Sequence, residues 1–250
     1  MRLKSLRGLV PLAVVLLIWQ LVGSTNTAGS TTPAPSTWWT AFKQIERSGT
    51  LWTGLRTTMV LYVEGLVVAI VLGVALGVAL GASRRLNQAF GGLLEFLRAT
   101  PAAALVPGAL LLFHATSGTK IGIVVYGSIW PILLNTAAAR KALAPLRLDV
   151  ARCMQMSWWD RMRKFVLPSL LPEIMVGIRI AASICLIVTL LVDVLVATGG
   201  LGYLLVQYQS TFQASSAFAM LAVIGVIGIL INLAIGAGER FVLRRWPSGG

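Results

Sequence analysis

Long stretches of apolar, uncharged residues constrain the fold of this chain more than any other feature. The segment Phe218–Ala237 contains no charged residue, and Thr57–Ala82 contains only Glu64. An α-helix rises about 1.5 Å per residue, so about 20 such residues cross the hydrocarbon core of a bilayer. The chain is 57% hydrophobic and 12% charged, whereas soluble domains carry about 25% charged residues. These features predict an all-α integral membrane protein.

Six segments are predicted to be transmembrane helices. They are Leu9–Val22, Thr57–Ala82, Ala89–Ala115, Ile121–Ala139, Leu170–Ala197 and Phe218–Ala237. The first is short and follows a basic start, so a cleaved signal peptide is an alternative interpretation of it. The third is interrupted by Pro101 and Pro107. The second contains Gly73, Gly77 and Gly81, a spacing that makes a groove for a second helix.

The basic residues are unevenly distributed between the predicted loops. The net charge is +13, but lysines and arginines lie in short runs between apolar segments, which is not the layout of a nucleic-acid-binding surface. Of the 21 basic residues, 15 fall on the side of the N-terminus and two, Arg98 and Arg179, fall in or beside spans. The other side has four, namely Lys43, Arg47, Arg56 and Lys120. Because cytoplasmic loops carry the excess of lysine and arginine, both termini are predicted to be cytoplasmic.

The residue inventory argues against several classes of enzyme. His114 is the only histidine, and no catalytic motif surrounds it. Cys153 and Cys185 are the only cysteines, too few for a disulfide framework or a Cys/His metal site. The sequence therefore argues against a self-contained membrane hydrolase or metalloenzyme.

The predicted cytoplasmic segment 140–170 is charged but has apolar residues at helical spacing. Ser157 followed by Asp160 resembles a capping box that begins a second helix at Trp158. A helix, a turn and a second helix are thus predicted, with Pro168 and Pro172 breaking the chain before the fifth span. Such a hairpin either lies on anionic lipid or docks into a partner protein.

Residues 149–159 of the chain read D-V-A-R-C-M-Q-M-S-W-W, and residues 167–172 read L-P-S-L-L-P. These residues resemble the EAA motif of permease subunits in bacterial ABC importers, which is broadly E-A-A-R-x-L-G-A-S followed by L-P-x-x-L-P. Other landmarks resemble the family in the same order, namely 97–101, 130–136, 177–179, Asp193 and 200–204. The set is similar to the branch of this family that carries nitrate, sulfonate, taurine and related small organic solutes. The resemblance covers most of the chain from about Leu55 onward.

The resemblance implies a non-catalytic permease subunit in the bacterial cytoplasmic (inner) membrane. Its cytoplasmic coupling helix hairpin would seat in a separate ABC-type ATPase. The coupling residues would be Asp149, Ala151, Arg152, Met154, Gln155, Ser157, Trp158 and Trp159. The sequence has no Walker A motif, so ATP and magnesium belong to the partner ATPase and this chain binds no cofactor. The other implied partners are a second permease, an extracytoplasmic solute-binding protein and membrane lipid.

Gln155 departs from the family pattern, because it stands where the family has a glycine in the turn. A left-handed backbone is expected there, and a residue other than glycine costs about 1 kcal/mol in that conformation. This departure slightly favours a heterodimer, in which the other permease keeps the stricter motif.

Five residues are predicted to lie at the gate or along the solute pathway: Asp193, Gly200, Gly202, Tyr203 and Gln207. A charge within a span marks a functional site by default, although Asp193 is also explained by an interhelical hydrogen bond or ion pair. The segment 198–203 is predicted either to form a re-entrant piece or to be an ordinary outer loop.

The organisation predicted from the sequence has three parts. Residues 1–54 hold the first span and an outer-face segment, residues 55–240 a five-helix permease core, and residues 241–250 a cytoplasmic tail. The predicted function is that of the permease subunit of an ATP-driven importer, forming half of a solute pathway. The alternative is a non-transporting membrane scaffold whose cytoplasmic hairpin binds lipid or protein.

Overall fold

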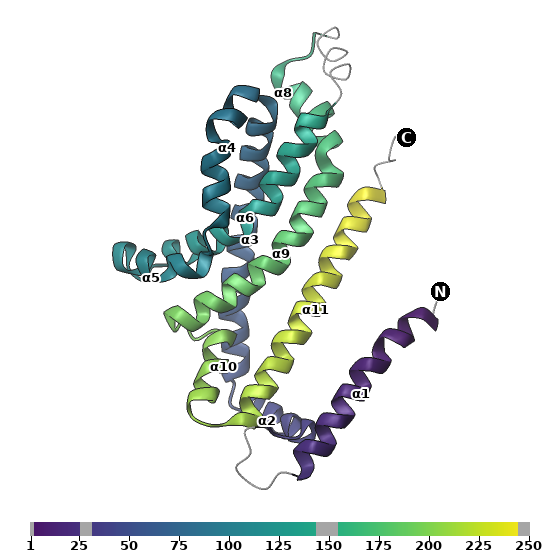
Figure 1. Ribbon diagram of the computed structural model, residues 1–250, viewed down its shortest axis with the longest axis vertical. Coiled ribbons are helices and arrows are strands. Elements are labelled where there is room, and N and C mark those ends of the chain that lie inside the picture. Colours follow the sequence, from purple (N-terminus) through teal and green to yellow (C-terminus); the bar gives the residue numbers. More distant parts are fainter. Residues whose placement is uncertain (1–2, 26–31, 144–154, 245–250) are drawn as a thin grey trace. The chain divides into compact units, whose positions relative to one another are not determined.

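The computed structural model describes residues 3–25, 32–143 and 155–244, and these are almost wholly helical (Figure 1). The helices are α1 (Leu3–Thr25), α2 (Pro35–Arg47), α3 (Thr50–Ala82), α4 (Arg84–Ala99), α5 (Ala102–Phe113), α6 (Ser117–Ala142), α8 (Trp158–Arg161), the π-helical turn η1 (Met162–Val166), α9 (Leu167–Val196), α10 (Leu201–Ser210) and α11 (Ala214–Arg244). The prediction of an all-α chain is confirmed for these residues.

The helices belong to two compact units. The first comprises Met1–Thr58 and Asp193–Ile227, and the second comprises Met59–Val192 and Gly228–Gly250. The boundaries fall inside α3, α9 and α11, so each of these helices contributes one end to each unit.

Four helices in the described part of the chain are long and apolar enough to cross a membrane. They are α3, α6, the continuous helix Trp158–Val196 and α11, and they correspond to the second, fourth, fifth and sixth predicted spans. The bent pair α4 and α5 makes a fifth if it counts as one span. The apolar part of α1, Ala13–Ser24, is shorter than the four helices that are long enough to cross a membrane. The structure thus supports a multi-pass protein with four to five candidate spans.

The third predicted span is two helices that meet at an angle of 92°. The bend lies at Thr100 and Pro101, which are both extended, with ψ angles of 119° and 129°. Proline disfavours a helical conformation in the residue before it, which explains the end of α4 at Ala99. Pro107, by contrast, lies inside α5 without interrupting it.

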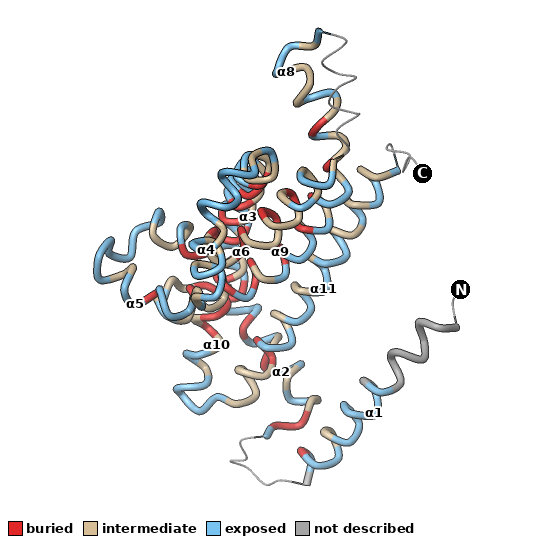
Figure 2. Tube along the Cα trace, turned by 45° about the horizontal axis from the view of Figure 1, so that its top comes forward, coloured by how far each residue is buried: buried red, intermediate tan, exposed pale blue. Residues whose placement is uncertain are grey.

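The glycines of α3 allow close packing against α6 in the second unit. A Cβ atom on Gly73 would lie 2.9 Å from Ile132, and one on Gly77 would lie 2.6 Å from Thr136. These approaches confirm the predicted helix-packing groove. Beside it, α3, α6 and α9 form a core of buried residues, namely Ala69, Val125, Ile129, Ile132 and Ala181. Buried parts of the chain are red in Figure 2.

The break predicted at Pro168 and Pro172 is wrong, because both prolines lie inside one continuous helix from Trp158 to Val196. The π-helical turn η1 ends at Val166, two residues before Pro168, and the Leu167 amide donates to the Met162 carbonyl. A proline ring clashes with the carbonyl four residues earlier. The wider π turn relieves that clash, since it displaces the carbonyl from its α-helical position.

In the first unit, α1 and α2 are joined by aromatic and polar contacts. The Trp19 ring meets Trp38 edge-on at 5.1 Å, and Trp38 stacks on Phe218 at 5.5 Å. Gln20 in α1 bonds Ser36 in α2 through its amide nitrogen and its amide oxygen, at 3.1 and 3.0 Å. These contacts fix α2 beside the C-terminal part of α1.

Candidate functional site

The carboxylate of Asp193 is the centre of a buried hydrogen-bond network in the first unit. Its side chain is wholly inaccessible to solvent. The Thr58 hydroxyl donates to Oδ2 at 2.6 Å, and the Thr198 hydroxyl donates to Oδ1 at 2.6 Å. These two short hydrogen bonds hold both side-chain oxygens of Asp193 in place where α9 ends.

Thr58 connects this carboxylate to the start of α10. Its hydroxyl oxygen accepts the backbone N–H of Leu201 at 2.8 Å while its proton goes to Asp193. The first N–H groups of a helix have no partner within the helix, and Thr58 satisfies one of them. One side chain from α3 therefore joins the end of α9 to the beginning of α10.

The chain between α9 and α10 is shaped to cover the carboxylate. Ala197 and Gly199 have positive φ angles, 52° and 77°, and the Thr198 N–H donates to the Asp193 carbonyl at 3.4 Å. This is the arrangement of a Schellman helix end. A Cβ atom on Gly200 would lie 2.2 Å from Asp193 Oδ2, so only glycine fits over the buried carboxylate.

The structure thus brings together two of the five predicted pathway residues, Asp193 and Gly200. Gly202 is buried in the first turn of α10. Tyr203 is half-buried and Gln207 is exposed further along that helix. Within the segment 198–203, residues 198–200 are non-helical and α10 begins at Leu201.

Sequence reasoning missed Thr58 and Thr198. Thr198 is five residues from Asp193, but Thr58 is 135 residues away, so no local spacing connects it to the carboxylate. The only available signal was a general one: a charge within a span requires polar partners from neighbouring helices. That requirement does not identify the helix or the position that supplies the partner of Asp193.

The described part of the predicted coupling hairpin begins at Gln155, in the turn before α8. Gln155 has a φ of 49°, which confirms the expected left-handed backbone at this position. Asp149, Ala151, Arg152 and Met154 lie outside the described residues.

Ser157 caps α8 as predicted. Its side-chain oxygen accepts the Asp160 N–H at 3.1 Å, and its hydroxyl donates to Asp160 Oδ2 at 2.9 Å. Asp160 also pairs with Lys164 at 2.8 Å, one turn further along the helix. After the cap, Trp158 and Trp159 are 61% and 64% exposed. Two large exposed rings on a capped helix end provide apolar surface suited to contact with another molecule.

This fold and these sites define a class of protein: a multi-pass helical membrane protein with an exposed, capped helix end between two of its spans. Residues 65–246 match the family described as "Binding-protein-dependent transport system inner membrane component". Since this match covers most of the chain, the protein belongs to that family. It is the non-catalytic, membrane-spanning permease component of an ABC transporter, and the scaffold alternative is set aside.

The chain is similar to several permeases over nearly its whole length. It is 30% identical to the aliphatic sulfonates transport permease SsuC of Escherichia coli (strain K12), covering 94% of this chain and 89% of that one. It is 27% identical to the bicarbonate transport system permease CmpB of Synechococcus elongatus, covering 94% and 90%. It is 26% identical to the nitrate import permease NrtB from the same species, covering 93% and 88%.

Among solved structures, the chain resembles one from the MetNI methionine ABC transporter in an inward-facing conformation. The TM-score is 0.67 at 20% sequence identity, and the alignment covers 79% of this chain and 98% of that one. At 20% identity, this likeness is evidence for the fold alone.

Proposed function

We propose that this chain forms one half of the solute pathway of an importer and transmits ATPase motion through the segment 140–170. The observation that carries the proposal is the capped helix end after Gln155, where Trp158 and Trp159 are exposed. Exposed apolar side chains at the end of a helix suit insertion into a groove of a partner protein. The continuous helix from Trp158 to Val196 would carry a displacement of that end into the membrane.

The proposed topology has six spans with both termini in the cytoplasm. It counts α1 and the bent pair of α4 and α5 as one span each, in addition to the four long helices. The distribution of 15 basic residues against four favours this orientation. It places the hairpin 140–170 inside the cell, where a cytoplasmic ATPase can reach it.

The proposed assembly contains two ABC-type ATPase subunits, an extracytoplasmic solute-binding protein and a second permease. ATP and magnesium would be bound by the ATPases. We favour a different permease as the second half, because Gln155 occupies a left-handed position where glycine costs least. Co-purification with a single permease species would contradict the heterodimer.

The proposed solute is a small oxyanion. The names of three similar permeases refer to aliphatic sulfonates, bicarbonate and nitrate, which all bear negatively charged oxygens. Asp193 would repel such a solute if it faced the pathway. Its complete burial under Gly200 and its bonds to two threonines agree with a role in holding the gate segment in place.

The test is transport in vesicles that contain the permease pair, the ATPase and the solute-binding protein. With Trp158→Ala and Trp159→Ala combined, we expect solute uptake and binding-protein-stimulated ATP hydrolysis to fall at least tenfold while the chain still inserts. Trp39→Ala and Trp52→Ala combined are the control, because these tryptophans are equally exposed, at 61% and 59%, in α2 and early α3. Equal uptake by both variants and the unsubstituted chain would exclude the coupling role.

A further inference from the structure

A groove of about 1080 Å³ runs beside the C-terminal turns of α11 in the second unit. The α9 residue Arg179 lines it together with Glu239, Arg240 and Arg244 of α11. Apolar side chains of α11, including Leu233 and Phe241, complete its lining. None of the functions assigned above uses this groove.

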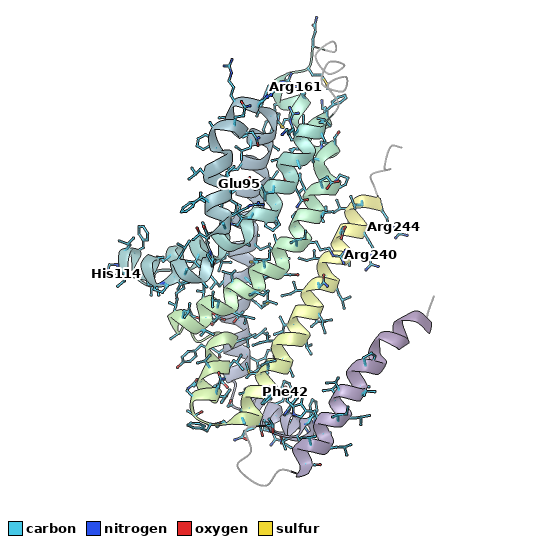
Figure 3. All side chains as sticks on the ribbon, viewed as in Figure 1. Phe42, Glu95, His114, Arg161, Arg240 and Arg244 are labelled. Atoms are coloured by element: carbon cyan, nitrogen blue, oxygen red, sulfur yellow. The ribbon has the colours of Figure 1, made fainter. Side chains whose placement is uncertain are left out.

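The charges along the groove are predominantly positive. Arg179 Nη1 donates to Glu239 Oε2 at 3.4 Å, so one arginine partly offsets the single carboxylate. Arg240 donates from Nε to the Gly236 carbonyl at 3.0 Å, which holds its guanidinium against the helix. Guanidinium has five N–H donors in a planar fork, so this bond occupies only one of them. Arg240 and Arg244 are exposed one turn apart, near the end of α11 (Figure 3).

The length of α11 places these arginines at the membrane surface. The helix has 31 residues, which span roughly 46 Å at 1.5 Å per residue, against a hydrocarbon core of about 30 Å. Residues 218–237 carry no charge and are long enough to fill that core, so the last turns that follow them extend into the headgroup layer. Leu233 and Phe241, 59% and 61% exposed, provide apolar surface beside the basic groups.

We propose that this groove binds the headgroup phosphate of an anionic phospholipid, with Arg240 and Arg244 on the phosphate and the apolar side chains against the acyl chains. Arginine suits phosphate because its fork can donate two parallel hydrogen bonds. Basic pockets between membrane helices on the cytoplasmic side attract anionic headgroups. The adjoining apolar surface favours a lipid over a free phosphate ion, which has nothing to place there.

The experiment measures lipid binding to the full chain purified in non-ionic detergent, using native mass spectrometry with phosphatidylglycerol and with phosphatidylcholine. For Arg240→Gln combined with Arg244→Gln, we expect phosphatidylglycerol to bind about tenfold more weakly, since each basic residue near a charged headgroup contributes appreciably. Phosphatidylcholine binding should not change. The double change to lysine retains the charge without the fork and should give an intermediate loss of about threefold.

The matched control is Arg84→Gln combined with Arg85→Gln, in the first turn of α4. Both residues are exposed, and the loss of charge is the same. This control should retain phosphatidylglycerol affinity within about twofold. An equal loss in both glutamine variants would mean general charge attraction and would overturn the site. If millimolar inorganic phosphate displaced phosphatidylglycerol effectively, the lipid assignment would be overturned. It would also be overturned if the glutamine variant of Arg240 and Arg244 bound lipid normally but lost a protein partner.

Discussion

At the scale of single residues, the gate segment depends on one shared hydroxyl group. Thr58 donates to Asp193 and accepts from Leu201 at the same oxygen. A buried carboxylate that loses its hydrogen-bond donor still carries the free-energy cost of its removal from water. A buried helix N–H that loses its acceptor carries the same kind of cost. Removal of this hydroxyl therefore affects two elements, whereas removal of the Thr198 hydroxyl affects only the carboxylate.

Thr58→Val should destabilise the protein by about 2 kcal/mol, because it deprives two buried polar groups of a partner without changing the side-chain shape. The thermal unfolding midpoint in detergent provides the measurement. Thr57→Val is the control, since the Thr57 hydroxyl bonds only the Thr53 carbonyl of its own helix, at 3.0 Å. If both substitutions lower the midpoint equally, Thr58 has no special role in the network.

The sequence indicated Asp193 and Gly200 but could not show that they touch. Asp193 is conspicuous because a charge in an apolar helix is costly. Gly200 is conspicuous because it belongs to a glycine-rich run. Their contact depends on the helix end between them, where Ala197 adopts a left-handed conformation that alanine rarely takes. Nothing in the composition of that turn predicts it.

At the scale of elements, proline alone did not predict where helices end. Pro101 ends a helix and redirects the chain by 92°, whereas Pro131 and Pro172 lie inside α6 and α9. An interior proline forfeits one hydrogen bond and strains one turn, costs that neighbouring helices and a π turn can absorb. The local sequence does not show which helices pack beside a proline, so the ends of the helices were less predictable than their existence.

Gln155→Gly should stabilise the turn before α8 by about 1 kcal/mol, because glycine adopts the left-handed backbone without a Cβ penalty. Amide hydrogen exchange in α8 should slow about fivefold if opening of this turn exposes those amides. Gln209→Gly, in the helical part of α10, should speed exchange there, because glycine costs up to about 1 kcal/mol inside a helix. The change from glutamine to glycine is thus expected to slow amide exchange at one position and to speed it at the other. Faster exchange in α8 of the Gln155→Gly variant would contradict the left-handed turn.

Gly77→Ala should destabilise the packing of α3 on α6 by about 2 kcal/mol, as overpacking of a fitted contact does. Its Cβ would lie 2.7 Å from the Leu133 carbonyl oxygen, a backbone atom that cannot rotate away. The control is Gly91→Ala in α4, where a Cβ has nothing within 4 Å and alanine favours the helix. Thermal unfolding in detergent compares the two. An unchanged midpoint for Gly77→Ala would mean that the helices separate easily at this contact.

At the scale of the whole molecule, hydropathy predicted which segments are apolar helices better than it predicted how many cross the membrane. Four predicted spans have counterparts in long helices. The other two depend on α1, whose apolar part is short, and on the bent pair of α4 and α5. Length and composition cannot decide these cases, because a kinked or short helix crosses only with support from its neighbours and from the bilayer.

The proposed topology predicts which positions a membrane-impermeant maleimide reaches in intact cells. In a chain without Cys153 and Cys185, single cysteines at the exposed positions Lys43 and Gln213 should react from outside. Cysteines at Arg85 and Arg163, also exposed, should react only after the membrane is permeabilised, because basic loops are retained in the cytoplasm.

An N-terminal epitope tag separates the six-span and five-span alternatives. With six spans, the tag stays on the mature chain and is accessible only from the cytoplasm. A cleaved signal peptide would remove the tag and leave the chain to begin outside, while the four cysteine positions would react as before. Outside labelling at Arg85 or Arg163 would instead reverse the topology. It would also place the capped end of α8 where no cytoplasmic ATPase can bind it, so this one measurement tests both the orientation and the coupling proposal.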